Sequence, residues 1–99
     1  MSTYVSLVKL TSEGVKDLKE WARNYDGMKK GAEAMGVKIT GAYALLGSYD
    51  MMFISEAADE KTAMMQAIFF TSRGATVETW TAVPMEEFTE ITRSIRAFL

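Results

Sequence analysis

The sequence predicts an α+β fold with the element order β-α-β-β-α-β and an added C-terminal helix. Four segments are rich in strand-forming residues, and three longer segments space their apolar side chains as helices do. Capping residues, glycines and one proline separate these segments at the ends where such residues are preferred. At 99 residues, the chain has the length of one domain, so we expect residues 1–99 to form a single domain.

The first strand is predicted at 3–10, where strand-forming residues point alternately to two faces. Thr11 offers an N-cap to the helix that follows, and Gly36 is placed to end that helix as a C′ glycine. We expect a bend or break at 24–27, because Gly27 and Gly31 both weaken the helix. The apolar stripe expected to be buried is Val15, Leu18, Ala22, Tyr25, Ala32 and Met35.

The two central strands are predicted at 37–46 and 51–56, joined by the turn Gly47-Ser48-Tyr49-Asp50. Gly41 interrupts the first of them and indicates a bulge or a close approach of another backbone. The second is apolar on both faces, which is typical of a central strand covered on both sides.

Asp59 is placed to cap a second helix at 60–73, which Gly74 ends. Its apolar residues surround more of the helix than the single stripe of a surface helix: Met64, Met65, Ile68, Phe69 and Phe70. A fourth strand is predicted at 76–83, and Pro84 begins a last helix. The stripe expected to be buried there is Phe88, Ile91, Ile95 and Phe98.

The first six elements follow the pattern of ferredoxin-like folds, an antiparallel four-stranded sheet with helices on one face. If polar content marks the bare face, that face holds Tyr4, Ser6, Asp50, Met52, Ile54, Glu78 and Trp80. A 48% hydrophobic chain of this size cannot bury all its apolar surface, so we expect a second copy to cover the face. The predicted assembly is a homodimer of the α/β-barrel kind or a larger oligomer. Its interface candidates are Met52, Ile54, Met64, Met65, Phe69, Phe70 and Trp80.

Composition excludes several functions. The chain has no cysteine and no histidine, so it lacks the usual zinc ligands, the proximal histidine of haem proteins and the Ser-His-Asp triad. We therefore expect no metal and no cofactor. A net charge of −2 without a basic run gives no support for nucleic-acid binding. No signal peptide or membrane-length apolar run is present, so we expect a cytoplasmic protein without a membrane partner.

Several short motifs run in order along the chain: Thr11-x-x-Gly14, Lys19, Gly41-x-Tyr43, Gly47-x-Tyr49-Asp50, Glu56-Ala57-x-Asp59 and Val77-x-Thr79. Together they resemble the GYD domain family over nearly the whole chain, to about Glu87. The resemblance implies the ferredoxin-like, dimeric α/β-barrel fold and no particular activity. The turn is also similar to one in the small-molecule-binding domains of leucine-responsive transcription regulators. Since no helix-turn-helix segment precedes the first strand, that similarity implies a stand-alone sensor or accessory domain.

The candidate site residues each have a structural and a functional interpretation. The Gly47–Asp50 turn is either a hairpin corner that fixes strand register or the mouth of a ligand pocket. The aromatic residues either line a pocket for a planar or carboxylate ligand or lie at a dimer contact. The ligand-binding candidates are Tyr4, Tyr43, Tyr49, Asp50 and Trp80.

The remaining candidates divide in the same way. Asp50, Glu56 and Glu78 would be an acid/base pair only if burial raised a pKa; otherwise they are solvated or ion-paired carboxylates. The Met64-Met65 and Phe69-Phe70 cluster is a ligand channel or, as we favour, core plus oligomer contact. Arg73 either holds an anion or, as we favour, complements a helix C-terminus.

Three functions are consistent with these features. The leading hypothesis is a self-associating domain that binds a small molecule or a partner protein. The second is a cofactor-independent enzyme of the dimeric α/β-barrel type, such as an isomerase or a small monooxygenase. The third is a structural or scaffold subunit whose function is assembly.

Overall fold

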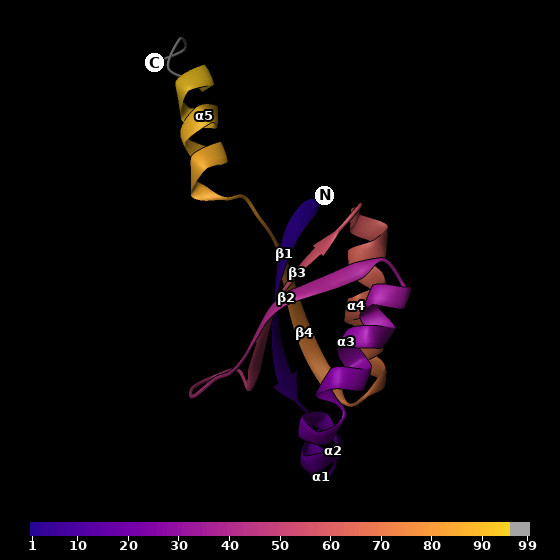
Figure 1. The fold of residues 1–99 in the computed structure, drawn as a ribbon. Helices are drawn as coiled ribbons and strands as arrows, with labels where there is room; N and C mark the ends of the chain where they lie inside the picture. Colours follow the sequence, from indigo (N-terminus) through magenta and orange to yellow (C-terminus); the bar gives the residue numbers. More distant parts are fainter. Residues whose placement is uncertain (96–99) are drawn as a thin grey trace.

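The protein, for which a computed structural model describes residues 1–95, forms a four-stranded sheet with helices on one side (Figure 1). The strands and helices follow the predicted order, with the first helix divided into three. Their bounds are β1 Ser2–Leu10, α1 Ser12–Lys16, α2 Leu18–Arg23, α3 Tyr25–Ala34, β2 Val37–Ala44, β3 Met51–Ala57, α4 Glu60–Ser72, β4 Ala75–Ala82 and α5 Met85–Ile95. The predicted α5 residue Phe98 lies outside the described residues.

The sheet has the strand order β2-β3-β1-β4, and every neighbouring pair is antiparallel. This order confirms the predicted α+β, ferredoxin-like fold. It places β1 and β3 in the centre and β2 at an edge, so the prediction that the strand before the Gly47–Asp50 turn is central is wrong. The pairing of β2 with β3 shifts between Ile39 and Gly41, which confirms the predicted irregularity at Gly41.

The first helical segment breaks at Asn24, as predicted, and also at Asp17. The second break was not predicted, and it turns α1 and α2 around one end of the sheet (Figure 1). The expected continuous stripe is therefore interrupted. Ala32 is buried, whereas Val15 and Leu18 are exposed because the short helices that carry them do not lie along the sheet.

Loops at that end of the sheet interlock closely. Thr11 caps α1 by accepting a hydrogen bond from the Gly14 N–H at 3.2 Å. The Thr11 N–H and hydroxyl both donate to the Gly74 carbonyl oxygen at 2.9 Å. A Cβ at Gly14 would stand 2.1 Å from that oxygen, so only glycine fits there. Gly74 has φ +84°, a conformation that glycine adopts without strain.

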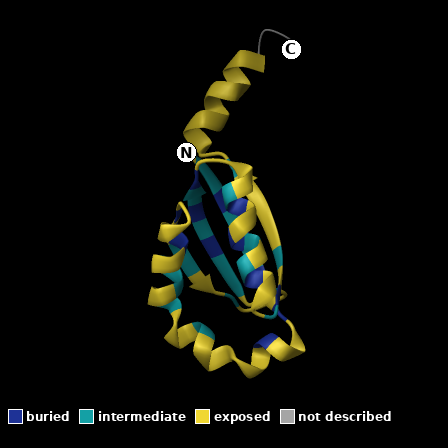
Figure 2. Cartoon of the chain, turned by 90° about the vertical axis from the view of Figure 1, so that its right-hand side faces the viewer, coloured by how far each residue is buried: buried dark blue, intermediate teal, exposed yellow. Residues whose placement is uncertain are grey.

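The core lies between the sheet and the helices (Figure 2). Phe70 of α4 is fully buried and stacks on Phe53 of β3, with ring centroids 4.9 Å apart. Trp21 of α2 also stacks on Phe70, with ring centroids 5.8 Å apart. α3 packs mainly on the edge strand β2, and α4 packs on the opposite edge strand β4. The two helices are therefore held apart over the central strands.

The predicted assignment of faces is wrong for β1. Tyr4 and Ser6 are buried under the helices, so Val5 and Leu7 lie on the open face instead. The register confirms this, because Val5 pairs with Ile54 and Leu7 pairs with Met52. The assumption that polar residues mark the bare face failed because hydroxyl groups can form hydrogen bonds with each other beneath the helices. Ser6 Oγ lies 3.3 Å from Thr79 Oγ1, within hydrogen-bonding distance.

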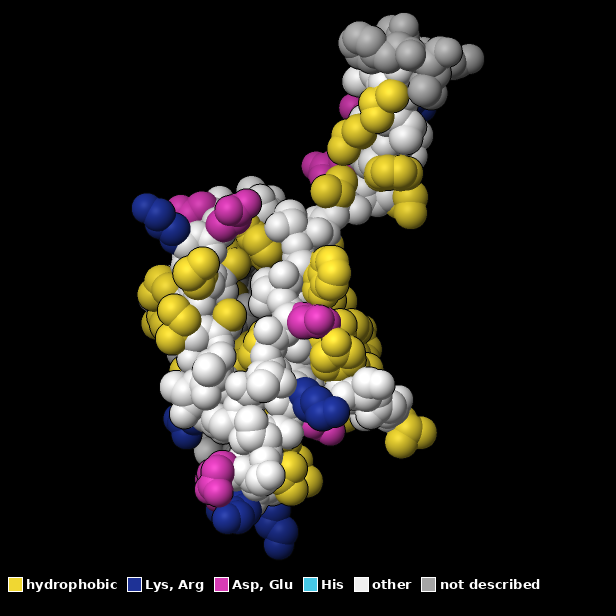
Figure 3. Space-filling model, turned by 180° about the vertical axis from the view of Figure 1, so that it is seen from behind, with side chains coloured by type: hydrophobic (Ala, Val, Ile, Leu, Met, Phe, Trp, Pro, Cys, Tyr) yellow, Lys and Arg dark blue, Asp and Glu magenta, His cyan; other side chains and the backbone are white. Residues whose placement is uncertain are grey.

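Helix α5 extends away from the body (Figure 1). Its predicted apolar stripe is present, but Phe88, Ile91 and Ile95 are exposed because no described element packs on them. The prediction of a buried stripe is therefore wrong for the described part of this chain. Figure 3 shows hydrophobic side chains along α5 and on the body below it. Within residues 1–95, no helix is long and apolar enough to cross a membrane.

Candidate functional site

The Gly47–Asp50 turn forms the corner between β2 and β3, with Gly47 at φ +137°. Asp50 Oδ2 accepts a hydrogen bond from the Leu10 N–H at 2.7 Å. The Asp50 N–H donates to the Val8 carbonyl oxygen at 2.8 Å, and the Asp50 carbonyl accepts from the Leu45 N–H at 2.9 Å. Asp50 thus ties the hairpin to the end of β1, and its carboxylate is engaged by backbone rather than directed at open space.

Tyr49 reaches across the end of the sheet to β4. Its hydroxyl donates to Glu78 Oε2 at 2.6 Å. This hydrogen bond, more than any other effect, raises the pKa of Tyr49, and the negative charge of Glu78 acts in the same direction. The phenol therefore stays protonated at neutral pH and serves as a donor, which does not favour Tyr49 as a base.

The aromatic candidates do not form one pocket within this chain. Tyr43 lies on β2 and Trp80 on β4, which are opposite edges of the sheet. Three strand spacings separate these edges, or about 14 Å. Tyr4 is buried on the other face, beneath the helices.

The open face instead carries an apolar patch. In one row across the sheet, Ile54, Val5 and Trp80 stand side by side; in the next, Tyr43, Met52 and Leu7 do so. Trp80 is 59% exposed, and no described helix covers these side chains. The open-face patch is defined here as Val5, Leu7, Tyr43, Met52, Ile54 and Trp80.

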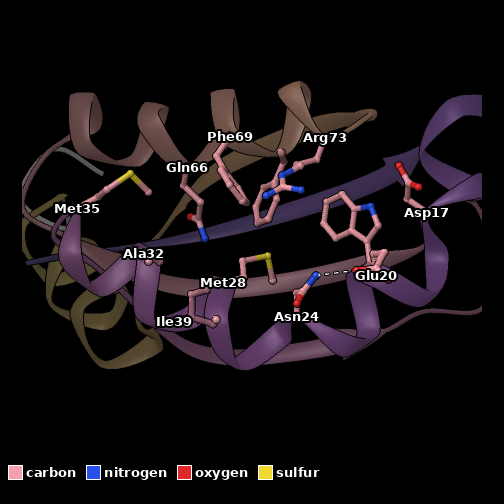
Figure 4. A pocket seen from close by; sticks show the side chains of 14 residues that line it. Asp17, Glu20, Asn24, Met28, Ala32, Met35, Ile39, Gln66, Phe69 and Arg73 are labelled. Atoms are coloured by element: carbon pink, nitrogen blue, oxygen red, sulfur yellow. Dashed lines mark hydrogen bonds between the residues drawn. The ribbon is translucent and has the colours of Figure 1, made fainter.

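A second feature lies on the helix side, where α3 and α4 diverge. A groove of about 680 Å³ runs between them, with Asp17 and Glu20 toward one end and Met35 toward the other (Figure 4). Its walls include Met28, Ile39 and Phe69. Arg73 lies over the Phe69 ring, with its Cζ atom 5.4 Å from the ring centroid. This space is the α3–α4 groove below.

Gln66 is the buried polar group of the α3–α4 groove. It is only 3% exposed, and its Oε1 accepts a hydrogen bond from Ser55 Oγ at 3.0 Å. Its Nε2 has no hydrogen-bond partner among the described residues. A sequence signal for this residue existed, since Ala63, Gln66 and Phe70 are spaced three and four apart and share one buried face of α4.

The predicted interface candidates of α4 fall in different surroundings. Met64 and Met65 are exposed on the outside of the helix, and Phe69 lines the groove. Phe70 is 0% exposed, so it belongs to the core and makes no surface contact in this chain. Within residues 1–95, no three acidic side chains gather in a way that could hold a metal ion.

Comparison with known proteins adds a family and a fold. The model of the GYD domain family matches residues 4–92. A protein of Thermus thermophilus, named glutamine synthetase and cystathionine beta-lyase binding protein, is 31% identical over 93 residues, which cover 88% of this chain and 94% of the relative.

Two solved structures share the fold. The crystal structure of TTHA0845 from Thermus thermophilus has a TM-score of 0.54 and 15% identity, covering 84% of this chain and 94% of the other. The crystal structure of FFRP-DM1 has a TM-score of 0.52 and 20% identity, covering 84% and 100% of the two chains.

Proposed function

The chain belongs to the GYD domain family, and from this premise we propose that it is a protein-binding domain that pairs with a second copy through its open-face patch. The observation that carries the proposal is the apolar character of that patch. Val5, Leu7, Met52 and Ile54 occupy the two central strands, where a sheet exposed to water would carry polar side chains. Pairing two such faces removes both from water.

Helix α5 supports the same conclusion through the area that a stable dimer needs. Four strands of about eight residues present roughly 500 Å² in plan. A standard interface buries about 800 Å² of accessible surface per partner, an area that the sheet face approaches and that α5 would extend. The exposed stripe of Phe88, Ile91 and Ile95 lies on a helix that extends beyond the sheet. We include α5 in the interface, where it packs on the second copy.

A protein partner is supported by the Thermus relative, whose name describes it as a binding protein for two enzymes. We extend only the class of partner, a folded protein, to this chain. The outside of α4 is the surface we propose for it. Met64, Met65 and Ile68 are exposed there and lie on the helix side, away from the open-face patch.

The test of self-association is size-exclusion chromatography with light scattering. We expect the full chain to be a dimer or larger at micromolar concentration and Trp80→Glu to shift it toward monomer, because two charges would be buried at the interface. Met64→Glu is the matched control, since it places the same charge on the outside of α4 and should leave the oligomer intact.

A monodisperse monomer of the unaltered chain would refute the proposal. So would an unchanged oligomer for Trp80→Glu, provided that circular dichroism shows both variants folded.

A further inference from the structure

The α3–α4 groove has features that packing alone does not explain. Gly27 and Gly31 stand one turn apart on α3 and line it. A Cβ at either position would meet nothing within 4 Å in the described part of the chain. A larger side chain would meet no obstacle at either position, yet both carry glycine, which after proline is the least favourable residue in a helix.

The buried amide points to the contents of the groove. Ser55 holds Gln66 Oε1, which turns Nε2 toward the groove, where Figure 4 shows the side chain reaching in from α4. A buried N–H donor without an acceptor is rare in folded proteins and is costly when it is left unpaired. An acceptor atom on a bound molecule would give the Gln66 N–H group its missing hydrogen-bond partner.

The chemistry of the lining narrows the class of molecule. Trp21, Phe69 and Phe70 present ring surface, and Met28 supplies an adaptable thioether. The Gln66 amide is neutral, so the acceptor beside it needs no charge, and Arg73 of the same lining lies over the Phe69 ring. The volume of about 680 Å³ lies within the range of small-molecule sites.

We propose that the α3–α4 groove binds a small, neutral, largely aromatic molecule whose carbonyl-type acceptor takes the free N–H of Gln66. The aromatic part lies against Trp21 and Phe69. Arg73 borders this aromatic part, because its Cζ atom lies 5.4 Å from the centroid of the Phe69 ring, and Glu20 lies toward the end of the groove near Asp17 (Figure 4). This site is on the opposite side of the sheet from the open-face patch and does not depend on dimer formation.

The test uses two probes that differ only in the acceptor, 2-acetylnaphthalene and 2-ethylnaphthalene, titrated into the ¹⁵N-labelled full chain. Binding is followed by NMR at the Trp21 indole and Gln66 amide signals. We expect both probes to shift the Trp21 signal and the ketone to bind about 3–10-fold more tightly, the worth of one hydrogen bond. In Gln66→Leu the two affinities should become equal, because only the ketone should bind more weakly than it does to the unaltered chain.

A groove-filling variant distinguishes this site from other apolar surfaces. Gly31→Met projects a side chain into the open space and should weaken both probes at least tenfold. Lys30→Met is the matched control, because Lys30 is exposed on the same helix and does not line the groove.

Three results would overturn the proposal: no shift of either signal with either probe, equal affinities in the unaltered chain, or unchanged binding in Gly31→Met. A probe that shifts only the Trp80 indole would place binding on the open-face patch and would also refute it.

Discussion

The contact between Gly14 and Gly74 yields a prediction whose magnitude follows from the structure. Adding a methyl group in Gly14→Ala places a Cβ 2.1 Å from the Gly74 carbonyl oxygen, whereas ordinary contact begins near 3.4 Å. The two loops must therefore separate by about 1.3 Å. The carbonyl also accepts two hydrogen bonds from Thr11 at 2.9 Å, which would lengthen beyond the range of a hydrogen bond.

The cost is obtained from those parts. Two lost hydrogen bonds destabilise by about 0.5–1.5 kcal/mol each, and the crowding adds about 1–3 kcal/mol. The better helix propensity of alanine returns about 1 kcal/mol. We expect the free energy of unfolding to fall by about 3 kcal/mol in Gly14→Ala, which moves the urea midpoint of a small protein by about 1–3 M.

The matched variant is Gly31→Ala, the same substitution in another helix. Its Cβ meets nothing within 4 Å among the described residues, so only propensity acts and stability should rise by about 0.5–1 kcal/mol. Urea unfolding followed by circular dichroism, at one protein concentration for all chains, measures both. If Gly14→Ala unfolds within about 0.5 M of the unaltered chain, the interlocked loops do not constrain the fold as described.

Three further predictions concern the core and the caps. Asp50→Ala should cost about 1–2 kcal/mol because the Leu10 N–H loses its acceptor, whereas Asp50→Asn keeps one; equal urea midpoints would contradict this. Phe70→Ala should cost about 3–5 kcal/mol in the same assay, and a loss below about 1 kcal/mol would show that this side chain is not central to the core. Hydrogen bonds from Thr62 lower the pKa of Asp59 in the folded protein. The ionised Asp59 therefore stabilises the fold above the unfolded pKa near 3.8, and this contribution is lost as pH falls through the lower folded pKa. Thermal midpoints between about pH 5 and pH 2 should fall less steeply in Asp59→Asn, and identical slopes would contradict that assignment.

The order of elements could be predicted because the signals are local. Thr11 and Asp59 cap helices with their own side chains, and Gly36 has the positive φ of a C′ residue. The break at Asn24 followed from the weak helix around Gly27, but the break at Asp17 has no comparable signal in the sequence. Local rules therefore predicted the elements and most of their ends. They failed around Asp17, where the helical segment changes direction.

Polarity placed Met52, Ile54 and Trp80 correctly on the open face but failed for β1, because polarity does not identify the covered side when hydroxyls pair beneath helices. Ser6 and Ser55 are both buried, with Thr79 and Gln66 as their respective hydrogen-bonding neighbours. The strand register would have corrected the assignment, since the pairing of Val5 with Ile54 puts both on one face. Register depends on contacts between residues distant in sequence, so it could not be predicted. The α3–α4 groove escaped prediction for a related reason: it depends on the two helices lying over opposite edge strands.

The two proposed sites are separated by the alternation of a single strand. In β3, Ile54 points to the open-face patch, whereas its neighbour Ser55 points to the helix side and holds Gln66. A change confined to the open face should therefore leave the groove intact, which allows the proposals to fail independently. We expect Trp80→Glu to be monomeric and to keep its affinity for 2-acetylnaphthalene. We expect Gly31→Met to remain oligomeric and to bind that ketone more weakly. If Trp80→Glu lost both while remaining folded, the groove would be completed only in the assembled protein, and the independence argued from the strand geometry would be wrong.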